Sequence, residues 1–291
     1  MVLASFLFAT MGVCVKLASD DFNSAEIVFW RGVIGVVFMG TYAKQRGIPL
    51  ATSVPWMHTW RSVIGVTSLS AWFYALTKLP LATAMTLNYM SSVWIAAFLV
   101  GGALIYKNAE KQRMLVMTVL AGFAGVVLIL RPTIEQNQMF AGLIGLLSGM
   151  GAALAYMQVM ALSRIGEPEA RVVFYFAVST VVAGGLAMVV TGISPTDHYS
   201  NWRTVLWLLP VGILASVGQL CMTRAYASGA TLVVANLQYS GIVFAAIYSL
   251  AFFGDQISWM GWLGIALIVA SGITATVLRS RAAPDSPAEE H

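Results

Sequence analysis

The chain reads as a series of long apolar runs separated by short breaks rich in charge, proline and asparagine. A helix needs about 20 mainly apolar residues to cross the hydrocarbon layer of a bilayer, and the runs have that length. They are too long for barrel strands and lack the two-residue alternation of such strands. The pattern therefore predicts ten transmembrane helices, at 1–18, 25–43, 61–79, 82–105, 114–131, 140–163, 170–191, 203–226, 231–253 and 259–279.

Composition favours lipid as the solvent. Of 291 residues, 59% are hydrophobic and 10% are charged, whereas a soluble chain carries about 25% charged residues. The net charge of +4 does not indicate nucleic-acid binding, because most of the lysines and arginines lie in a few short loops. The first span lacks the basic start of a signal peptide, so we interpret it as a true helix. Residues 280–291 are predicted to form a disordered cytoplasmic tail.

The positive-inside rule predicts the orientation. With a cytoplasmic N-terminus, the cytoplasmic loops hold ten basic residues and the external loops hold three. The cytoplasmic set is Lys44, Arg46, Arg61, Lys107, Lys111, Arg113, Arg164, Arg171, Arg279 and Arg281, and the external set is Lys78, Arg131 and Arg203. Both termini are therefore expected on the cytoplasmic side of a multi-pass protein.

The two halves of the chain match each other at a shift of about 150 residues. At that shift Ala75, Leu87, Tyr89, Val93 and Ala96 fall on Ala225, Leu237, Tyr239, Val243 and Ala246. Each half, 1–131 and 132–279, holds five spans, so the second half must enter the membrane from the opposite side. The predicted fold class is an all-α polytopic membrane protein of two inverted five-helix repeats. Such repeats are typical of secondary transporters with a midplane substrate site between the halves.

Tyr89 and Tyr239 are the first candidates for that site. Each lies near the middle of a span and shares a helical face with small residues, which leave room beside the ring. The functional interpretation is a cavity whose hydroxyls meet a polar substrate group. The structural alternative is close helix packing on the small residues.

A second set of candidates consists of one large aromatic residue and several uncharged polar or adaptable side chains within spans. Trp72 lies far from either interface, and its counterpart in the repeat is Met222. Polar side chains inside spans usually face the protein interior or a wet cavity, although helix-to-helix hydrogen bonding explains them equally well. The further candidates are Met85, Asn88, Ser92, Tyr156, Gln158, Gln219 and Gln238.

Three basic residues fall within predicted spans. Arg31 is the deepest, and we expect it either to bind a substrate carboxylate or to anchor the acidic loop that precedes it. Lys16 and Arg224 lie near span ends, where their heads are expected to snorkel toward water. No Asp or Glu lies in the middle of any span, which argues against proton coupling through a carboxylate.

Other function classes find less support in the sequence. His58, His198 and His291 all lie outside the spans, and no HExxH, GxSxG or phosphate-binding GxxxxGK[ST] pattern is present. Cys14 and Cys221 have no metal spacing, so no metal or cofactor is expected. A channel would need a charged or carbonyl-lined filter, and the sequence indicates neither.

Several short motifs carry a family resemblance. They are Lys16-Leu17, Ser24-Ala25-Glu26, Phe29-Trp30-Arg31, Tyr74-Ala75-Leu76, Leu79-Pro80-Leu81-Ala82, Gly122-Phe123-Ala124-Gly125-Val126, Ala225-Tyr226-Ala227, Gly254-Asp255 and Gly272-Ile273. In this order they resemble the EamA-type carriers of the drug/metabolite transporter superfamily, most nearly the bacterial aromatic amino acid exporters. The second half carries Gly254-Asp255 where that family usually shows Gly-Glu.

The resemblance implies spans 1–4 and 6–9 around a central cavity, with spans 5 and 10 peripheral. It also implies a bacterial inner-membrane exporter of small metabolites, and we expect aromatic or large apolar amino acids as substrates. The alternative is a facilitative channel, or an exporter of other amphipathic metabolites or drugs. The expected partners are the substrate and the bilayer, with no nucleic acid, and the protein is expected to be a monomer or homodimer.

Overall fold

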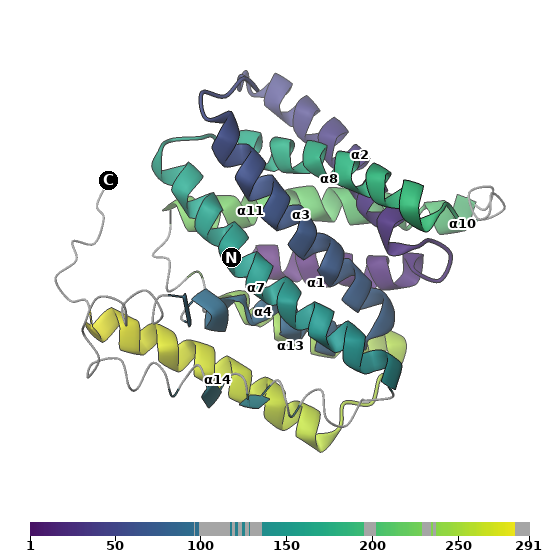
Figure 1. Ribbon diagram of the computed structural model, residues 1–291, viewed down its shortest axis with the longest axis vertical. Coiled ribbons are helices and arrows are strands. Elements are labelled where there is room, and N and C mark those ends of the chain that lie inside the picture. The colour runs from purple at the N-terminus through teal and green to yellow at the C-terminus, as the bar shows by residue number, and fades with distance from the viewer. Residues whose placement is uncertain are drawn as a thin grey trace.

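The computed structural model is all-helical in the part of the chain that it describes (Figure 1). It describes residues 1–95, 136–194, 202–228 and 237–282, together with a few single residues between 97 and 128 and residue 234. The helices are α1 (Val2–Ala18), α2 (Ser24–Gln45), α3 (Pro55–Lys78), α4 (Leu81–Tyr89), α7 (Gln136–Arg164), α8 (Glu169–Thr191), α10 (Trp202–Val205), α11 (Leu208–Ser228), α13 (Ser240–Phe253) and α14 (Trp259–Ala282).

Four of these helices are long and apolar enough to cross a membrane. They are α2, α7, α8 and α11, and α1, α13 and the first part of α14 are shorter apolar helices. The predicted span at 114–131 and the predicted boundary between the halves lie outside the well-described ranges. The count of ten spans therefore stays a prediction.

Local sequence signals explain several helix ends. Asn23 and Glu26 form a capping box at the start of α2, in which each side chain accepts the other residue's backbone N–H. Pro55 occupies the first turn of α3, where its missing N–H costs nothing. Gly254 ends α13 with a φ of 59°, a left-handed conformation that glycine adopts without strain.

Helices from the two halves pack against each other throughout the bundle. The most extensive pairs are α2 with α8, α3 with α7 and α1 with α11. Small residues allow these close approaches. A Cβ at Gly184 in α8 would lie 2.7 Å from the backbone of Phe29 in α2, and a Cβ at Gly149 in α7 would overlap the carbonyl oxygen of Leu87 in α4. Side chains of both halves consequently pack into one common core.

Two predicted spans are interrupted near their middles. The span expected at 82–105 begins as α4 but ends at Tyr89, where a turn at Met90 precedes a further helical segment at 91–95. The Met90 N–H donates to the carbonyls of both Thr86 and Leu87, at 3.1 and 3.3 Å. The matching span has a turn at Tyr239 before α13 begins. The break in α4 follows Leu87, whose carbonyl oxygen faces Gly149 of α7 so closely that a Cβ there would overlap it. An apolar pattern does not reveal such a tertiary contact.

Helix α14 lies to one side of the bundle in Figure 1, as the family resemblance implied for span 10. A Cβ at Gly125, in the predicted fifth span, would meet Ile268 of α14 at 2.8 Å. The helix also continues to Ala282, so residues 280–282 are helical, whereas the sequence predicts them as the start of a disordered tail.

Candidate functional site

A small cavity lies at the centre of the bundle. Its lining comes from α1, α3 and α4 of the first half and from α7, α8 and α11 of the second. The lining residues are Phe8, Arg61, Gly65, Ser68, Leu69, Trp72, Asn88, Tyr89, Ala152, Ala155, Tyr156, Phe176 and Gln219. The cavity volume is about 50 Å³, well below the roughly 300 Å³ at which ligand pockets begin. A metabolite can enter only if the helices around the cavity move apart.

Five of the predicted site residues lie on this cavity: Trp72, Asn88, Tyr89, Tyr156 and Gln219. The others are placed nearby or elsewhere. Met85, Met222, Ser92, Gln238 and Tyr239 are buried in the surrounding core, Gln158 is half-buried on α7, and Arg31 is buried but does not line the cavity. The structure thus brings together candidates from α3, α4, α7 and α11, whereas Gln238 and Tyr239, just before α13, lie behind the cavity wall.

Hydrogen bonds hold two of the cavity's polar side chains in place. The Asn88 amide donates to Ser148 Oγ at 3.2 Å, and Ser68 donates to the Ser148 carbonyl at 2.7 Å. These bonds join α3 and α4 of the first half to α7 of the second. They fix the orientation of Asn88 at the cavity wall.

Gln238 connects the cavity wall to the core behind it. Its amide nitrogen lies 3.4 Å from the Tyr156 hydroxyl, and its amide oxygen accepts from Tyr226 at 3.1 Å. The rings of Tyr156 and Tyr226 stack with centroids 5.6 Å apart. Gln238 therefore acts as a helix-to-helix hydrogen-bonding residue, the structural alternative that the sequence left open.

Arg61 was expected in a cytoplasmic loop, and this expectation is wrong. Its exposed fraction is 3%, and it lines the cavity from the second turn of α3. The guanidinium carbon lies 3.8 Å from the centroid of the Phe176 ring. Arg61 shares a helical face with Gly65, Ser68 and Trp72 by the i, i+4, i+7 and i+11 spacing, and this spacing would have connected Arg61 with the candidate Trp72.

Phe8 and Phe176 are cavity residues that sequence reasoning missed. Both are phenylalanines in apolar helices with no polar atom and no unusual spacing, so the sequence carries no signal that separates them from ordinary core residues. Phe176 also contacts Arg31, whose guanidinium carbon lies 5.3 Å from the centroid of the Phe176 ring. The two arginines therefore share one aromatic ring.

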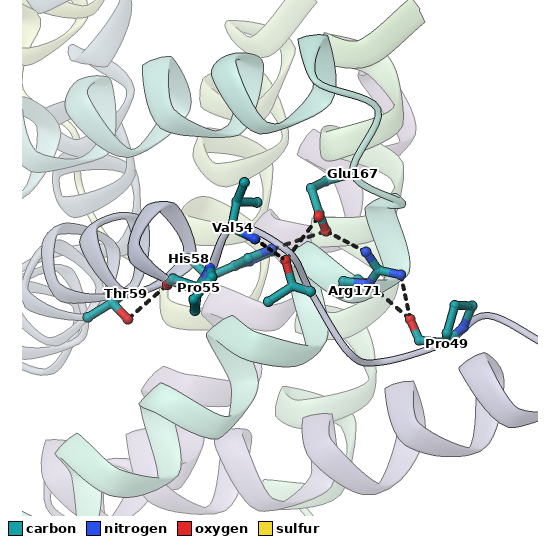
Figure 2. Close-up of polar contacts among 8 residues, drawn as sticks. Pro49, Val54, Pro55, His58, Thr59, Glu167 and Arg171 are labelled. Carbon is teal, nitrogen blue, oxygen red and sulfur yellow. Dashed lines mark hydrogen bonds and ion pairs between the residues drawn. The ribbon is translucent and has the colours of Figure 1, made fainter.

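A buried polar cluster joins the halves at the N-terminal end of α3 (Figure 2). Glu167, between α7 and α8, accepts hydrogen bonds from Thr52 at 2.9 Å and from Arg171 at 3.0 Å, and lies 3.2 Å from His58 Nε2. Arg171 also donates to the Pro49 carbonyl at 2.7 and 2.9 Å. We call these five residues the His58–Glu167 cluster. It closes the bundle between the α2–α3 loop and the α7–α8 loop.

Burial and hydrogen bonding shift the pKa values of His58 and Glu167, which both lie outside the predicted spans. Burial lowers the pKa of His58, and the neighbouring Glu167 only partly offsets this. Burial alone would raise the pKa of Glu167. The hydrogen bonds from Thr52, His58 and Arg171 outweigh it and hold that pKa below its ordinary value.

Both shifts predict a protein that loses stability in acid. The lowered pKa of His58 favours its neutral form in the fold. The stability that neutral His58 contributes is therefore complete above about pH 6.5 and is lost as the pH falls below that value. The lowered pKa of Glu167 means that its carboxylate stabilises the fold above about pH 4.3, and this stabilisation is lost at lower pH. We expect the melting temperature in detergent to be flat above pH 7 and to fall between pH 6.5 and 5.

His58→Gln should flatten the decline between pH 6.5 and 5, measured by thermal unfolding of purified protein. Glu167→Gln should lower stability at pH 7.5 by about 2 kcal/mol, because it leaves the buried Arg171 without its charged partner. The exposed Arg224→Gln is the matched control. A wild-type melting temperature that rises on acidification would contradict the assignment.

A second polar link joins the halves at the other end of α3. Lys16 at the end of α1 lies 3.4 Å from Asp255 Oδ2 and donates at 3.4 Å to the carbonyl of Leu79. Asp255 also accepts from Ser249 at 2.6 Å. We call these residues the Lys16–Asp255 link. Lys16 is thus paired with a carboxylate of the second half and does not simply snorkel toward water, as the sequence suggested.

A bundle of apolar helices, several of them long enough to cross a membrane, around a small cavity with both apolar and polar lining residues is the architecture of a polytopic membrane protein. Comparison with known proteins identifies its family. The EamA-like transporter family matches residues 1–131 and 143–277, and the chain belongs to this family. As a member of this family, the protein is a transporter and not an enzyme.

Named relatives extend over nearly the whole chain. The pseudopaline exporter CntI of Pseudomonas aeruginosa is 30% identical over 95% of this chain and 92% of its own length. A riboflavin transporter of Rhizobium johnstonii is 28% identical over 94% of this chain and 88% of its own. A protein of known crystal structure shares the fold with a TM-score of 0.66 at 19% identity, covering 96% of each chain.

These relatives define the chain as a multi-pass membrane protein that is homologous to bacterial membrane exporters. They also correct the resemblance drawn from sequence motifs. The family assignment is confirmed, but the named relatives are transporters of pseudopaline and riboflavin, not of aromatic amino acids.

Proposed function

We propose that the protein exports a small amphipathic metabolite from the bacterial cytoplasm by alternating access, and that the substrate binds in the central cavity. One observation carries this proposal: residues of both halves line a single cavity that presents aromatic faces beside uncharged amides. Trp72 and Tyr156 offer surface to an apolar body, and Asn88 and Gln219 offer hydrogen bonds to a polar head. Aromatic and large apolar amino acids have this composition and are the first class to test.

The buried indole N–H of Trp72 supports a ligand-binding role. No hydrogen-bond acceptor lies within reach of Trp72 Nε1 in the part of the chain that the structure describes. A buried donor without a partner costs roughly 1–3 kcal/mol. A substrate acceptor beside the indole would satisfy this donor, so we place a polar group of the substrate next to Trp72 Nε1.

Alternating access draws support from the two polar links. The His58–Glu167 cluster and the Lys16–Asp255 link lie at opposite ends of α3, and each joins a residue of the first half to a residue of the second. We infer that the two links open in turn, so that the cavity faces one side of the membrane at a time. The separate family matches at 1–131 and 143–277 support an internal repeat, and we propose that the two repeats are inverted, as this movement requires.

Two tryptophans on the same helix provide the test of the site. Trp72 lines the cavity, whereas Trp60 is 48% exposed on the outside of α3. In proteoliposomes loaded with unlabelled L-phenylalanine, labelled L-phenylalanine should enter by exchange. Trp72→Ala should lower the exchange rate by about tenfold, because it removes the stacking surface.

Trp60→Ala, the same change on the lipid-facing side, should leave the exchange rate within about twofold. Equal effects of the two substitutions would contradict the placement of the site. Exchange is also the property that separates a carrier from a channel. A channel would show labelled flux that internal substrate does not accelerate.

A further inference from the structure

Arg61 is a buried cation that has no counter-ion among the residues that the structure describes. Within the same part of the chain its Nε and Nη1 groups have no hydrogen-bond partner, and Nη2 makes one long contact of 3.4 Å to the Gln219 amide oxygen. No carboxylate among the described residues forms an ion pair with it. An arginine that is 3% exposed is costly in this condition, because a buried charge needs a partner and satisfied hydrogen bonds.

Among the described residues, the two carboxylates of the α7–α8 region are already engaged elsewhere. Glu167 is held by His58, Thr52 and Arg171, and Glu169 pairs with Arg224 at 3.8 Å. Arg31 adds a second buried guanidinium on the same Phe176 ring. The ring faces stabilise the cations in part, but no carboxylate among the described residues compensates the positive charge of this region.

Helix α3 also leaves space for the guanidinium group of Arg61 beside the cavity. Gly65 lies one turn further along α3, and a Cβ there would overlap Arg61 Nη1. The absence of a side chain at this position allows the guanidinium to lie along the cavity wall, within the same lining as Asn88 and Trp72. A planar fork of free N–H donors is suited to a carboxylate.

We propose that Arg61 is the anion-binding residue of the cavity, and that the transported solute carries a carboxylate beside its apolar body. This rests on the proposed function, because it assumes that the cavity is the substrate site. Arg31 is a supporting cation behind Phe176: it raises the positive potential without touching the solute. At a repeat shift of 144 residues, which aligns this span with its counterpart, the second half holds Tyr175 where the first holds Arg31, so we place anion recognition on one side of the cavity.

The test measures the charge of the cavity without knowledge of the substrate. Ala155, a small lining residue, is replaced in the variant Cys14→Ala/Cys221→Ala/Ala155→Cys. Its thiol is then reacted with a methanethiosulfonate that bears either a sulfonate or a trimethylammonium group. The reaction rate of each reagent with the protein is divided by the rate of the same reagent with a free thiol in solution. We expect the anionic reagent to react about tenfold faster than the cationic one.

Adding Arg61→Gln should remove this preference, and Arg61→Lys should keep most of it. Arg224→Gln, which changes an arginine exposed at the end of α11, should leave the preference unchanged. An unchanged preference after Arg61→Gln, or a faster cationic reagent in the parent, would overturn the proposal while leaving the cavity as the substrate site. A thiol that neither reagent reaches would overturn the proposed function itself.

A second measurement keeps Arg61 in place and covers the case in which Arg61→Gln does not fold. Labelling of Ala155→Cys should be slowed about tenfold by saturating 3-phenylpropanoate and not by 2-phenylethylamine, which has the same ring without the carboxylate. Equal protection by the two compounds, or protection by the amine alone, would overturn the assignment of a carboxylate to the solute.

Discussion

Cross-linking the two halves across the Lys16–Asp255 link should reduce transport to background. In a chain without Cys14 and Cys221, Lys16→Cys and Asp255→Cys would be joined by a bifunctional methanethiosulfonate. The charged atoms of these two side chains lie 3.4 Å apart, so a short reagent can bridge the positions. If the link must open in each cycle, a covalent bridge holds the cavity closed on that side.

The effect should be complete and reversible. Transport should return when a reductant breaks the two disulfides, which separates the effect of the bridge from that of the substitutions. A matched control lies within one half: Glu169 and Arg224 are 3.8 Å apart, on α8 and α11. Bridging Glu169→Cys to Arg224→Cys should leave most of the transport, because both residues move with the second half.

Full transport with the bridge in place at positions 16 and 255 would show that this end of the bundle does not open. The same experiment at the other end, with Thr52→Cys and Glu167→Cys, completes the comparison. Alternating access requires that a bridge at either end stops the cycle. If a bridge stops transport at one end only, the other end does not need to open and close during transport, and this result would contradict alternating access.

The apolar pattern predicts the helices well where length and composition decide. The predicted spans at 25–43, 170–191 and 203–226 correspond to α2, α8 and α11 with shifts of a few residues. These helices bury apolar faces on one side and meet lipid on the other, so their sequence signal is continuous. The breaks at Met90 and Tyr239 carry no such signal, because neither proline nor glycine stands at the turn.

The candidate site was partly predictable for a related reason. Trp72, Asn88 and Tyr89 are unusual residues in the middle of apolar spans, and each lies on the cavity. Tyr239 has the same sequence signal as Tyr89 and is buried in the core. The repeat relates positions in the chain, but the two halves differ in their side chains, so equivalent positions do not share equivalent surroundings.

Arg61 shows what the charge pattern misses. Counting basic residues near span ends assigns it to a cytoplasmic loop, together with Arg46 and Lys44. The structure instead starts α3 at Pro55 and so carries Arg61 into the bundle, where it stacks on Phe176 of the other half. A partner from a distant segment decides its role, and one sequence does not show which segments meet.

Access to the cavity from both sides of the membrane tests the central claim most directly. Ala152 lines the cavity from α7, and Ala152→Cys in the chain without Cys14 and Cys221 places a thiol there with little change in volume. Val37→Cys, on the outer face of α2 with 64% of the side chain exposed, is the control that faces lipid. A membrane-impermeant thiol reagent is applied to right-side-out and to inside-out vesicles, and the labelled fraction is measured by mass spectrometry. The account predicts that Ala152→Cys reacts from both sides and Val37→Cys from neither. Reaction of Ala152→Cys from one side alone, or from neither side, would contradict alternating access through this cavity.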